Sequence, residues 1–156
     1  MNKYQAHPTA VIDEGALIGE GCTIWHFCHI SGGSSIGKGC TLGQNVYVAP
    51  KVNIGQRVKI QNNVSLFTGV IVEDDVFLGP SCVFTNILTP RSEVNRKDQF
   101  LKTTVKKGAS IGANAVILCG NEIGRYAMVG AGSVVTKSIK DFELVAGNPA
   151  VHFGWV

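Results

Sequence analysis

A six-residue repeat constrains this chain more than any other feature of its sequence. Large apolar residues recur at every sixth position, without a skipped step, through the first half of the chain. They are Ile12, Ile18, Ile24, Ile30, Ile36, Leu42, Val48, Ile54, Ile60, Leu66, Val72, Leu78 and Phe84. A small or β-branched residue follows four positions after each of them, as at Ala16 and Cys22. A repeat this strict predicts a repeat fold, with both positions pointing inward.

The position between the two inward residues is usually Gly, Asn or Asp. Examples are Gly15, Gly21, Gly33, Gly39, Asn45, Asn63, Gly69 and Asp75. These residues tolerate the left-handed backbone of a tight corner. Short strands should therefore alternate with corners. Three strands per turn, one from each six-residue unit, close a triangular coil whose neighbours are about 4.8 Å apart. The prediction is an all-β chain folded as a parallel β-helix.

The repeat is interrupted once. It stops after Phe84 and resumes at Val105, and the interval between them is not a multiple of six, so the face on which it resumes stays open. We expect a single domain over 1–156. Its segments are an N-terminal lead-in (1–11), a first repeat block (12–85), an inserted loop (86–104), a second repeat block (105–139) and a C-terminal segment (140–156). Long irregular insertions in compact folds are usually functional.

Composition excludes several classes of protein. A net charge of +3 is too small to indicate a nucleic-acid partner. No apolar run approaches the roughly 20 residues of a membrane span, and the polar start is unlike a signal peptide, so we expect a cytoplasmic protein. Four of the five cysteines occupy inward repeat positions and match no zinc spacing. We expect packed, reduced thiols and no metal site.

One repeat unit carries bulky side chains where its neighbours have corner residues. Residues 24–29 read Ile-Trp-His-Phe-Cys-His, which leaves Trp25, His26, Phe27 and His29 outside the core. Stacking of equivalent positions on successive coils places amide side chains, including Asn62 and Asn63, above this group. Such a surface suits a nucleotide base, a sugar or a subunit interface.

Five motifs resemble those of a known family. The Gly-Ala-Gly run at 130–132 and the Gly-Asn-Pro-Ala segment at 147–150 resemble the acetyl-CoA site of hexapeptide-repeat acyltransferases. Together with WHFCHI at 25–30, FTN at 84–86 and PR at 90–91, the segment GNPAVHFGW at 147–155 more narrowly resembles bacterial sugar-nucleotide 3-N-acetyltransferases. This resemblance covers nearly the whole chain. It implies a left-handed coil and a homotrimer with three active sites between subunits.

The resemblance also implies where acetyl-CoA, the cosubstrate, would lie. Ala113 and Ala131 occupy equivalent positions one full turn apart, so their backbones should stack on successive coils and offer hydrogen bonds to an extended ligand. The candidate acetyl-CoA contacts are Gly112, Ala113 and Ala131 for its pantetheine, and Arg125, Lys137, Asn148 and Pro149 for its phosphate and adenine end.

Other residues are candidates for the sugar substrate and the chemistry. Asn86 could orient the amine or the acetyl carbonyl, since an amide both donates and accepts. His26 or His29 would serve as the base, if a base is needed. Arg91 suits a uronate carboxylate or a diphosphate. Trp25, Asn62 and Asn63 complete the candidate substrate contacts.

The resemblance implies acetylation of the 3-amino group of a UDP-linked 2-acetamido-3-amino-2,3-dideoxy-glucuronate used for surface polysaccharide, the O-antigen. One alternative is a dTDP-linked 3-amino-3,6-dideoxyhexose, which lacks the carboxylate. A second is a non-catalytic trimeric β-helix that binds a partner or a metal ion through the surface from Trp25 to His29.

Overall fold

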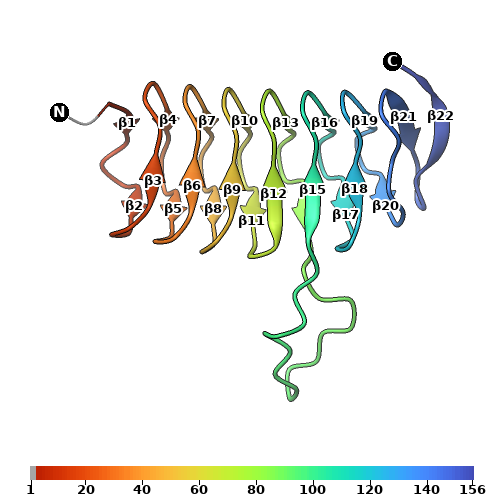
Figure 1. Cartoon of the computed structure of the whole chain (residues 1–156), viewed down its shortest axis with the longest axis horizontal. Helices are drawn as coiled ribbons and strands as arrows, with labels where there is room; N and C mark the ends of the chain where they lie inside the picture. The colour runs from red at the N-terminus through yellow and green to blue at the C-terminus, as the bar shows by residue number, and fades with distance from the viewer. Residues whose placement is uncertain (1–2) are drawn as a thin grey trace.

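The computed structural model describes residues 3–156 and shows a coil of short strands (Figure 1). Equivalent strands of successive turns pair in parallel, which gives the coil three sheets. The residues from 3 to 156 form no α-helix, and hence no helix able to cross a membrane. The prediction of a parallel β-helix is confirmed.

The strands alternate between the three sheets in chain order. The first sheet contains β1 (Gln5–Ala6), β4 (Thr23–Ile24), β7 (Thr41–Leu42), β10 (Lys59–Ile60), β13 (Phe77–Leu78), β16 (Ser110–Ile111), β19 (Met128–Val129), β21 (Glu143–Ala146) and β22 (Val151–Trp155). The second contains β2 (Val11–Ile12), β5 (His29–Ile30), β8 (Tyr47–Val48), β11 (Ser65–Leu66), β14 (Val83–Phe84), β17 (Val116–Ile117) and β20 (Val134–Val135). The third contains β3 (Leu17–Ile18), β6 (Ser35–Ile36), β9 (Asn53–Ile54), β12 (Val70–Val72), β15 (Thr103–Val105) and β18 (Glu122–Ile123).

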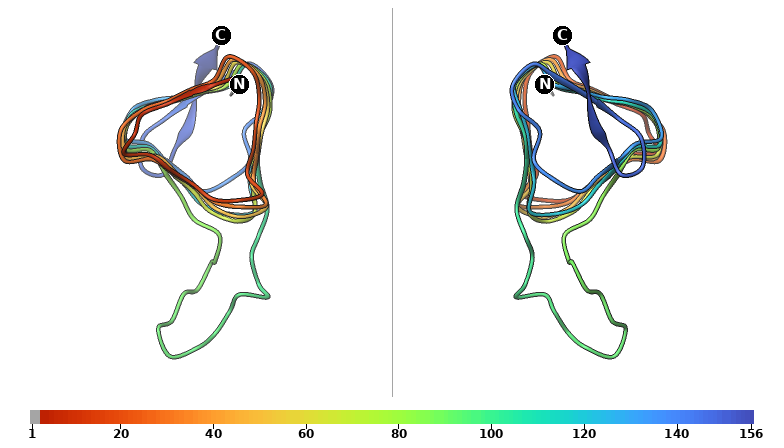
Figure 2. Two further views of the ribbon diagram at one scale, coloured as in Figure 1. Left: turned by 90° about the vertical axis from the view of Figure 1, so that its left-hand side faces the viewer. Right: turned by 90° about the vertical axis from the view of Figure 1, so that its right-hand side faces the viewer.

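We number the coils from the N-terminus, each beginning with a strand of the first sheet. The first corner joins the first sheet to the second, the second corner joins the second sheet to the third, and the third corner leads back to the first sheet. Seen from its N-terminal end the chain runs anticlockwise as it recedes, so the triangular coil is left-handed (Figure 2).

The inward residues of the repeat form one continuous core. Ile30, Leu42, Ile60, Leu66 and Leu78 are completely buried. At most corners the corner residue has a positive φ, including places where it is not Gly, Asn or Asp. These exceptions include Phe27 (φ 59°), Lys51, Arg57 and Ser81. The repeat of the core therefore imposes the left-handed backbone conformation at a corner even where the residue there does not favour it.

The inserted loop leaves the coil at the second corner and projects away from it (Figures 1 and 2). Strand β14 ends at Phe84, and β15 begins at Thr103, just before the expected restart at Val105. An uninterrupted repeat would stack Pro90 on Val72, but Val72 pairs with Val105 instead, so the loop is extra chain inserted within one coil. The second block thus resumes on the third sheet, the face that the sequence left open.

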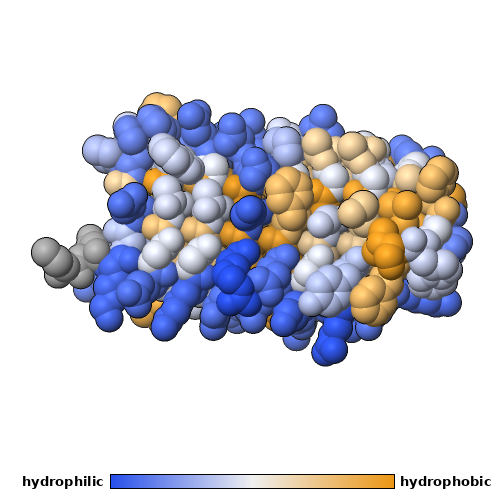
Figure 3. Space-filling model, turned by 90° about the horizontal axis from the view of Figure 1, so that it is seen from above, coloured by the Kyte–Doolittle hydropathy of each residue, from blue (hydrophilic) through white to orange (hydrophobic). Residues whose placement is uncertain are grey.

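The two ends of the coil differ. Strand β1 already pairs with β4, so the first coil begins inside the expected lead-in, at Gln5. At the other end, β21 extends the first sheet, and β22 folds back on it in antiparallel orientation. The view from above shows hydrophobic side chains gathered towards the C-terminal end (Figure 3). On this face, the hydrophobic surface is therefore concentrated towards the C-terminal end of the coil.

Candidate active site

The first corner of coil 2 carries an aromatic cluster formed by Trp25, His26 and Phe27. The imidazole rings of His26 and His7 are stacked, with 3.5 Å between their centroids. The backbone N–H of Phe27 donates to Thr9 Oγ1 at 3.0 Å. Residues of coil 1 therefore fix two members of the cluster, while Trp25 keeps 46% of its surface exposed.

The two asparagines predicted to contact substrate lie at the first corner of coil 4. Asn62 Oδ1 accepts a 2.8 Å hydrogen bond from the backbone N–H of Gln44, and Asn63 Oδ1 accepts one from Asn45 Nδ2 at 3.2 Å. Stacking of amides on successive coils is as predicted. Each Oδ1 atom accepts a hydrogen bond from the coil below, and the Nδ2 group of Asn62 has no partner among the described residues.

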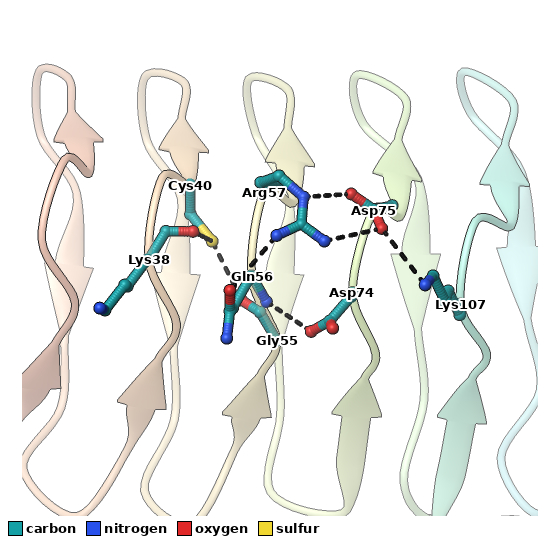
Figure 4. Close-up of polar contacts among 8 residues, drawn as sticks. All are labelled: Lys38, Cys40, Gly55, Gln56, Arg57, Asp74, Asp75 and Lys107. Atoms are coloured by element: carbon teal, nitrogen blue, oxygen red, sulfur yellow. Dashed lines mark hydrogen bonds and ion pairs between the residues drawn. The ribbon is translucent and has the colours of Figure 1, made fainter.

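The same hydrogen bond recurs at the third corner, which shows that it belongs to the fold. There Asp74 Oδ1 accepts from the backbone N–H of Gln56 at 2.7 Å (Figure 4). Next to it Arg57 donates two hydrogen bonds to Asp75, at 2.6 and 3.0 Å. Hydrogen bonding to Arg57 lowers the pKa of the Asp75 carboxyl. These hydrogen bonds join successive coils, so we assign the charged residues of this corner a role in the fold and not in the candidate site.

The backbone stacks closely at the first corner of coils 6 and 7, as it does at other glycine corners of the coil such as Gly37. A Cβ atom on Gly112 would lie 2.5 Å from the backbone N of Ala131, so only glycine fits there. The N–H of Gly132 donates to the carbonyl of Ala113 at 2.8 Å. Stacking of Ala113 and Ala131 is thus confirmed, although their contact with acetyl-CoA stays a prediction.

The segment containing Asn148 and Pro149 lies at the same corner. The N–H of Gly147 donates to Ser133 Oγ at 3.1 Å, and the N–H of Ala150 donates to the carbonyl of Val134 at 2.8 Å. The structure therefore brings residues 147–150 to the end of the first-corner column.

The second corner of coil 5 holds Asn86 at the base of the loop. Asn86 Nδ2 donates to the carbonyl of Thr68 at 3.0 Å, and Thr68 Oγ1 donates to the carbonyl of Pro50 at 2.8 Å. The N–H of Leu101 donates to the Asn86 carbonyl at 2.9 Å, which closes the loop. Thr68 positions Asn86 and was not among the predicted site residues, although its place one full turn, 18 residues, before Asn86 was a signal in the sequence.

Two candidate cations lie on different corners. Lys137 follows β20 and belongs to the second corner, as does the loop that carries the exposed Arg91. Arg125 follows β18 and belongs to the third corner, where its N–H donates to Asp141 Oδ1 at 2.7 Å. One chain therefore does not bring Arg125 together with Gly112 and Ala131.

Both candidate bases lie on coil 2, whereas Asn86 lies on coil 5. Three coil spacings separate these levels by about 14 Å. His29 is on the outer face of the second sheet, where its Nε2 is 3.0 Å from Asp13 Oδ2. The stacked His26 has a buried Nδ1 atom without a hydrogen-bond partner in the described chain. Neither imidazole reaches the level of Asn86.

The cysteines are packing residues, as predicted. All five are free and buried. Burial raises the pKa of Cys40 to about 11 and that of Cys82 to about 12, so both thiols are protonated at neutral pH. Across residues 3–156, no three His, Cys, Asp or Glu side chains are grouped so that they could hold a metal ion.

Two family models match the repeat blocks on either side of the loop. The model for bacterial transferase hexapeptide (six repeats) matches residues 15–50 and 33–68. The model for the hexapeptide repeat of succinyl-transferase matches residues 103–137. Together the matches cover more than half of the chain.

Individual relatives are similar over part of their length. Over 59 residues, 38% of this chain, the identity is 64% to dTDP-3-amino-3,6-dideoxy-alpha-D-galactopyranose 3-N-acetyltransferase of Aneurinibacillus thermoaerophilus. The match covers 31% of that protein, which is less than a third of its length.

Two solved structures share the fold. One is a mutant of GDP-perosamine N-acetyl transferase from Caulobacter crescentus in complex with CoA and GDP-perosamine (TM-score 0.59, 22% identity, 97% of this chain, 56% of that one). The other is the acetyltransferase domain of PglB from Neisseria gonorrhoeae in complex with acetyl coenzyme A (TM-score 0.64, 18% identity, 97% and 58%). The repeat, the left-handed coil and the family matches agree: this chain belongs to the bacterial hexapeptide-repeat transferase family.

Proposed function

We propose that this chain is an acetyl-CoA-dependent N-acetyltransferase that acts on the 3-amino group of a nucleotide-linked sugar. The observation that carries the proposal is the order of the candidate residues along the coil. The aromatic cluster lies on coil 2, Asn62 on coil 4, Asn86 on coil 5, and the stacked glycine-alanine corner on coils 6 and 7. Along the axis of the coil, a sugar nucleotide and acetyl-CoA laid end to end would meet at the level of Asn86, which lies on the second corner whereas the other residues lie on the first.

A homotrimer would bring the second corner, which carries Asn86, next to the first corner of a neighbouring subunit, which carries the aromatic cluster and the stacked glycine-alanine backbone. The candidate residues other than Arg125 lie on the second sheet, at its two flanking corners, or in the loop and C-terminal segment attached there. The outer face of this sheet carries Val11 and Val83, which are 56% and 45% exposed. If three such sheets pack around a threefold axis, the first corner of one subunit meets the second corner of the next. Asn86 would then face a neighbour's Ala113.

The geometry favours a role for Asn86 in holding the amine. One N–H of its Nδ2 group donates to the Thr68 carbonyl and fixes the plane of the amide, while its Oδ1 atom, which only accepts, has no partner among the described residues. An amine N–H donates, whereas an acetyl carbonyl accepts. Asn86 would therefore orient the amine, with the nitrogen lone pair directed at the thioester carbon.

The proposed reaction needs no base from His26 or His29. The amine nitrogen attacks the thioester carbonyl, the new C–N bond forms, and the C–S bond breaks. The proton lost by nitrogen balances the thiolate that leaves as CoA thiol. A threefold axis parallel to the coil keeps every subunit at the same level, so a neighbour's histidines are also about 14 Å from Asn86 along the axis. Positioning of two bound substrates supplies much of the rate enhancement, roughly 7 to 11 kcal/mol in favourable cases.

Two sugar nucleotides are candidate substrates. The name of the Aneurinibacillus relative supports a dTDP-linked 3-amino-3,6-dideoxyhexose. The exposed Arg91 on the loop supports the UDP-linked 3-amino uronate, because guanidinium binds carboxylate through two parallel hydrogen bonds.

Free-thiol release from acetyl-CoA with each sugar nucleotide tests the proposal. UDP-N-acetylglucosamine, which has a hydroxyl at C3, is the matched control and should release no thiol. Turnover of one amino sugar identifies the substrate, and light scattering of the same sample should give three times the chain mass of 16.6 kDa. No thiol release with either amino sugar would refute the enzyme and favour the non-catalytic scaffold.

A further inference from the structure

A small pocket lies beside the aromatic cluster at the N-terminal end of the coil. Its volume is about 240 Å³, and it is lined by residues 5–8 of coil 1 and residues 23–25 of coil 2. The half-exposed indole of Trp25 forms part of its wall. The pocket lies outside the acetyl-CoA corner and three coils from Asn86.

The lining suits a flat ring with polar edges. Trp25 and Pro8 supply apolar surface, while Gln5 and Thr23 supply an amide and a hydroxyl that can donate and accept. The Trp25 ring lies nearly parallel to that of its neighbour His26, at an angle of 4°. His26 is itself stacked on His7. The indole next to this stack is thus available for a base to stack on.

The distance to Asn86 matches a sugar nucleotide. About thirteen covalent bonds separate the base of a nucleoside-diphosphate sugar from its 3-amino nitrogen. A backbone of about four residues has a similar number of bonds and extends to about 14 Å. The level of Trp25 is also about 14 Å from that of Asn86. An extended sugar nucleotide can therefore place its amine at Asn86 and its base at coil 2.

We infer that this pocket binds the pyrimidine base of the sugar nucleotide, stacked on Trp25, while Asn86 of the adjoining subunit holds the amine. The inference rests on the proposed function, since the amine position defines the distance. It also gives the aromatic cluster a role in substrate binding that does not involve proton transfer.

Nucleotide binding without turnover tests this site. Trp155→Phe leaves Trp25 as the sole tryptophan, since the chain has two, and removes an exposed indole at the opposite end of the coil. Addition of UDP or dTDP should quench its fluorescence. In calorimetry, Trp25→Ala should weaken nucleotide binding roughly 5- to 150-fold, as expected for a lost stacking contact. Trp25→Phe should retain most of the affinity, and Trp155→Phe should bind like wild type.

The outcomes separate the inference from the proposed function. Unchanged nucleotide affinity in Trp25→Ala, or no quenching by either nucleotide, overturns the base site even if acetyl transfer proceeds. Trp25-dependent nucleotide binding without acetyl transfer upholds the base site and refutes the enzyme. With active protein, Trp25→Ala should raise the KM for the sugar nucleotide and leave the KM for acetyl-CoA unchanged. A rise in both would assign Trp25 a structural role.

Discussion

Replacement of Asn86 by alanine separates its structural role from its proposed catalytic one. The substitution removes one neutral hydrogen bond, from Nδ2 to the Thr68 carbonyl at 3.0 Å. Such a bond contributes about 1 kcal/mol to the free energy of unfolding. For a chain of this size, that loss corresponds to a Tm lower by about 2–4 °C. The backbone contact with Leu101 that closes the loop does not need the side chain, so the fold should persist.

The effect on catalysis should be much larger than the effect on stability. Without Asn86 Oδ1 the amine is no longer aimed at the thioester, and misplacement by about 1 Å costs roughly 100-fold in rate. We expect kcat to fall by about this factor while the KM for acetyl-CoA stays unchanged. Thiol release under saturating substrates gives kcat, and thermal unfolding gives Tm.

Asn53→Ala is the matched control. Asn53 lies on the outer face of the third sheet, where its Oδ1 accepts a 2.8 Å hydrogen bond from Ser35 Oγ. This variant should lose similar stability and keep wild-type kcat. The reasoning is refuted if Asn86→Ala retains more than about a third of the wild-type kcat. Equal losses of kcat in both variants would show that the effect is general to the fold.

Three further predictions concern the coil. In a urea titration, Gly37→Ala should lower the free energy of unfolding by about 3 kcal/mol, because its Cβ would lie 2.5 Å from the Gly55 carbonyl oxygen. Gly33→Ala is the control: its Cβ would enter open space, and only its φ of 79° is unfavourable, so it should lower the free energy of unfolding by about 1 kcal/mol. The pKa of Asp75 is lowered from 3.8, so its contribution is present above that pH and is lost as pH falls through the folded-state pKa; wild type should exceed Asp75→Asn in stability at pH 7, and a gap that persisted at the acid end would contradict the ion pair. Cys82 should react with a thiol reagent only after unfolding, since burial raises its pKa to about 12; rapid labelling of the native protein would contradict its burial.

The sequence was sufficient for the parts of the fold that repeat. The six-residue period predicted the strands, the corners and the stacking of successive turns, since each depends only on contacts between equivalent positions. It could not place the second block, because the loop is closed by specific bonds such as Leu101 N–H to the Asn86 carbonyl. No period encodes such a closure.

The sequence predicted which candidate residues stack on successive coils better than it predicted which corner each one occupies. Grouping Arg125 with Ala131 overlooked a signal that the sequence contains: one full repeat unit, a strand and a corner, separates them. The capping role of Asn62 Oδ1 was not visible, because it depends on how closely Gly43 and Asn62 approach. The distance from the histidines to Asn86 is also contained in the sequence, because the uninterrupted repeat separates their levels by three full turns.

The uniform coil makes substrate length a modular property. Removal of one whole turn between coil 2 and coil 5 would keep every side chain on its own face and corner and shorten the span between the two proposed binding positions by about 4.8 Å. Removal of a single repeat unit would instead rotate everything beyond it onto the next face. At the proposed site, adding or removing a turn would therefore change the length of the accepted molecule in whole steps and leave the surfaces at either end unchanged.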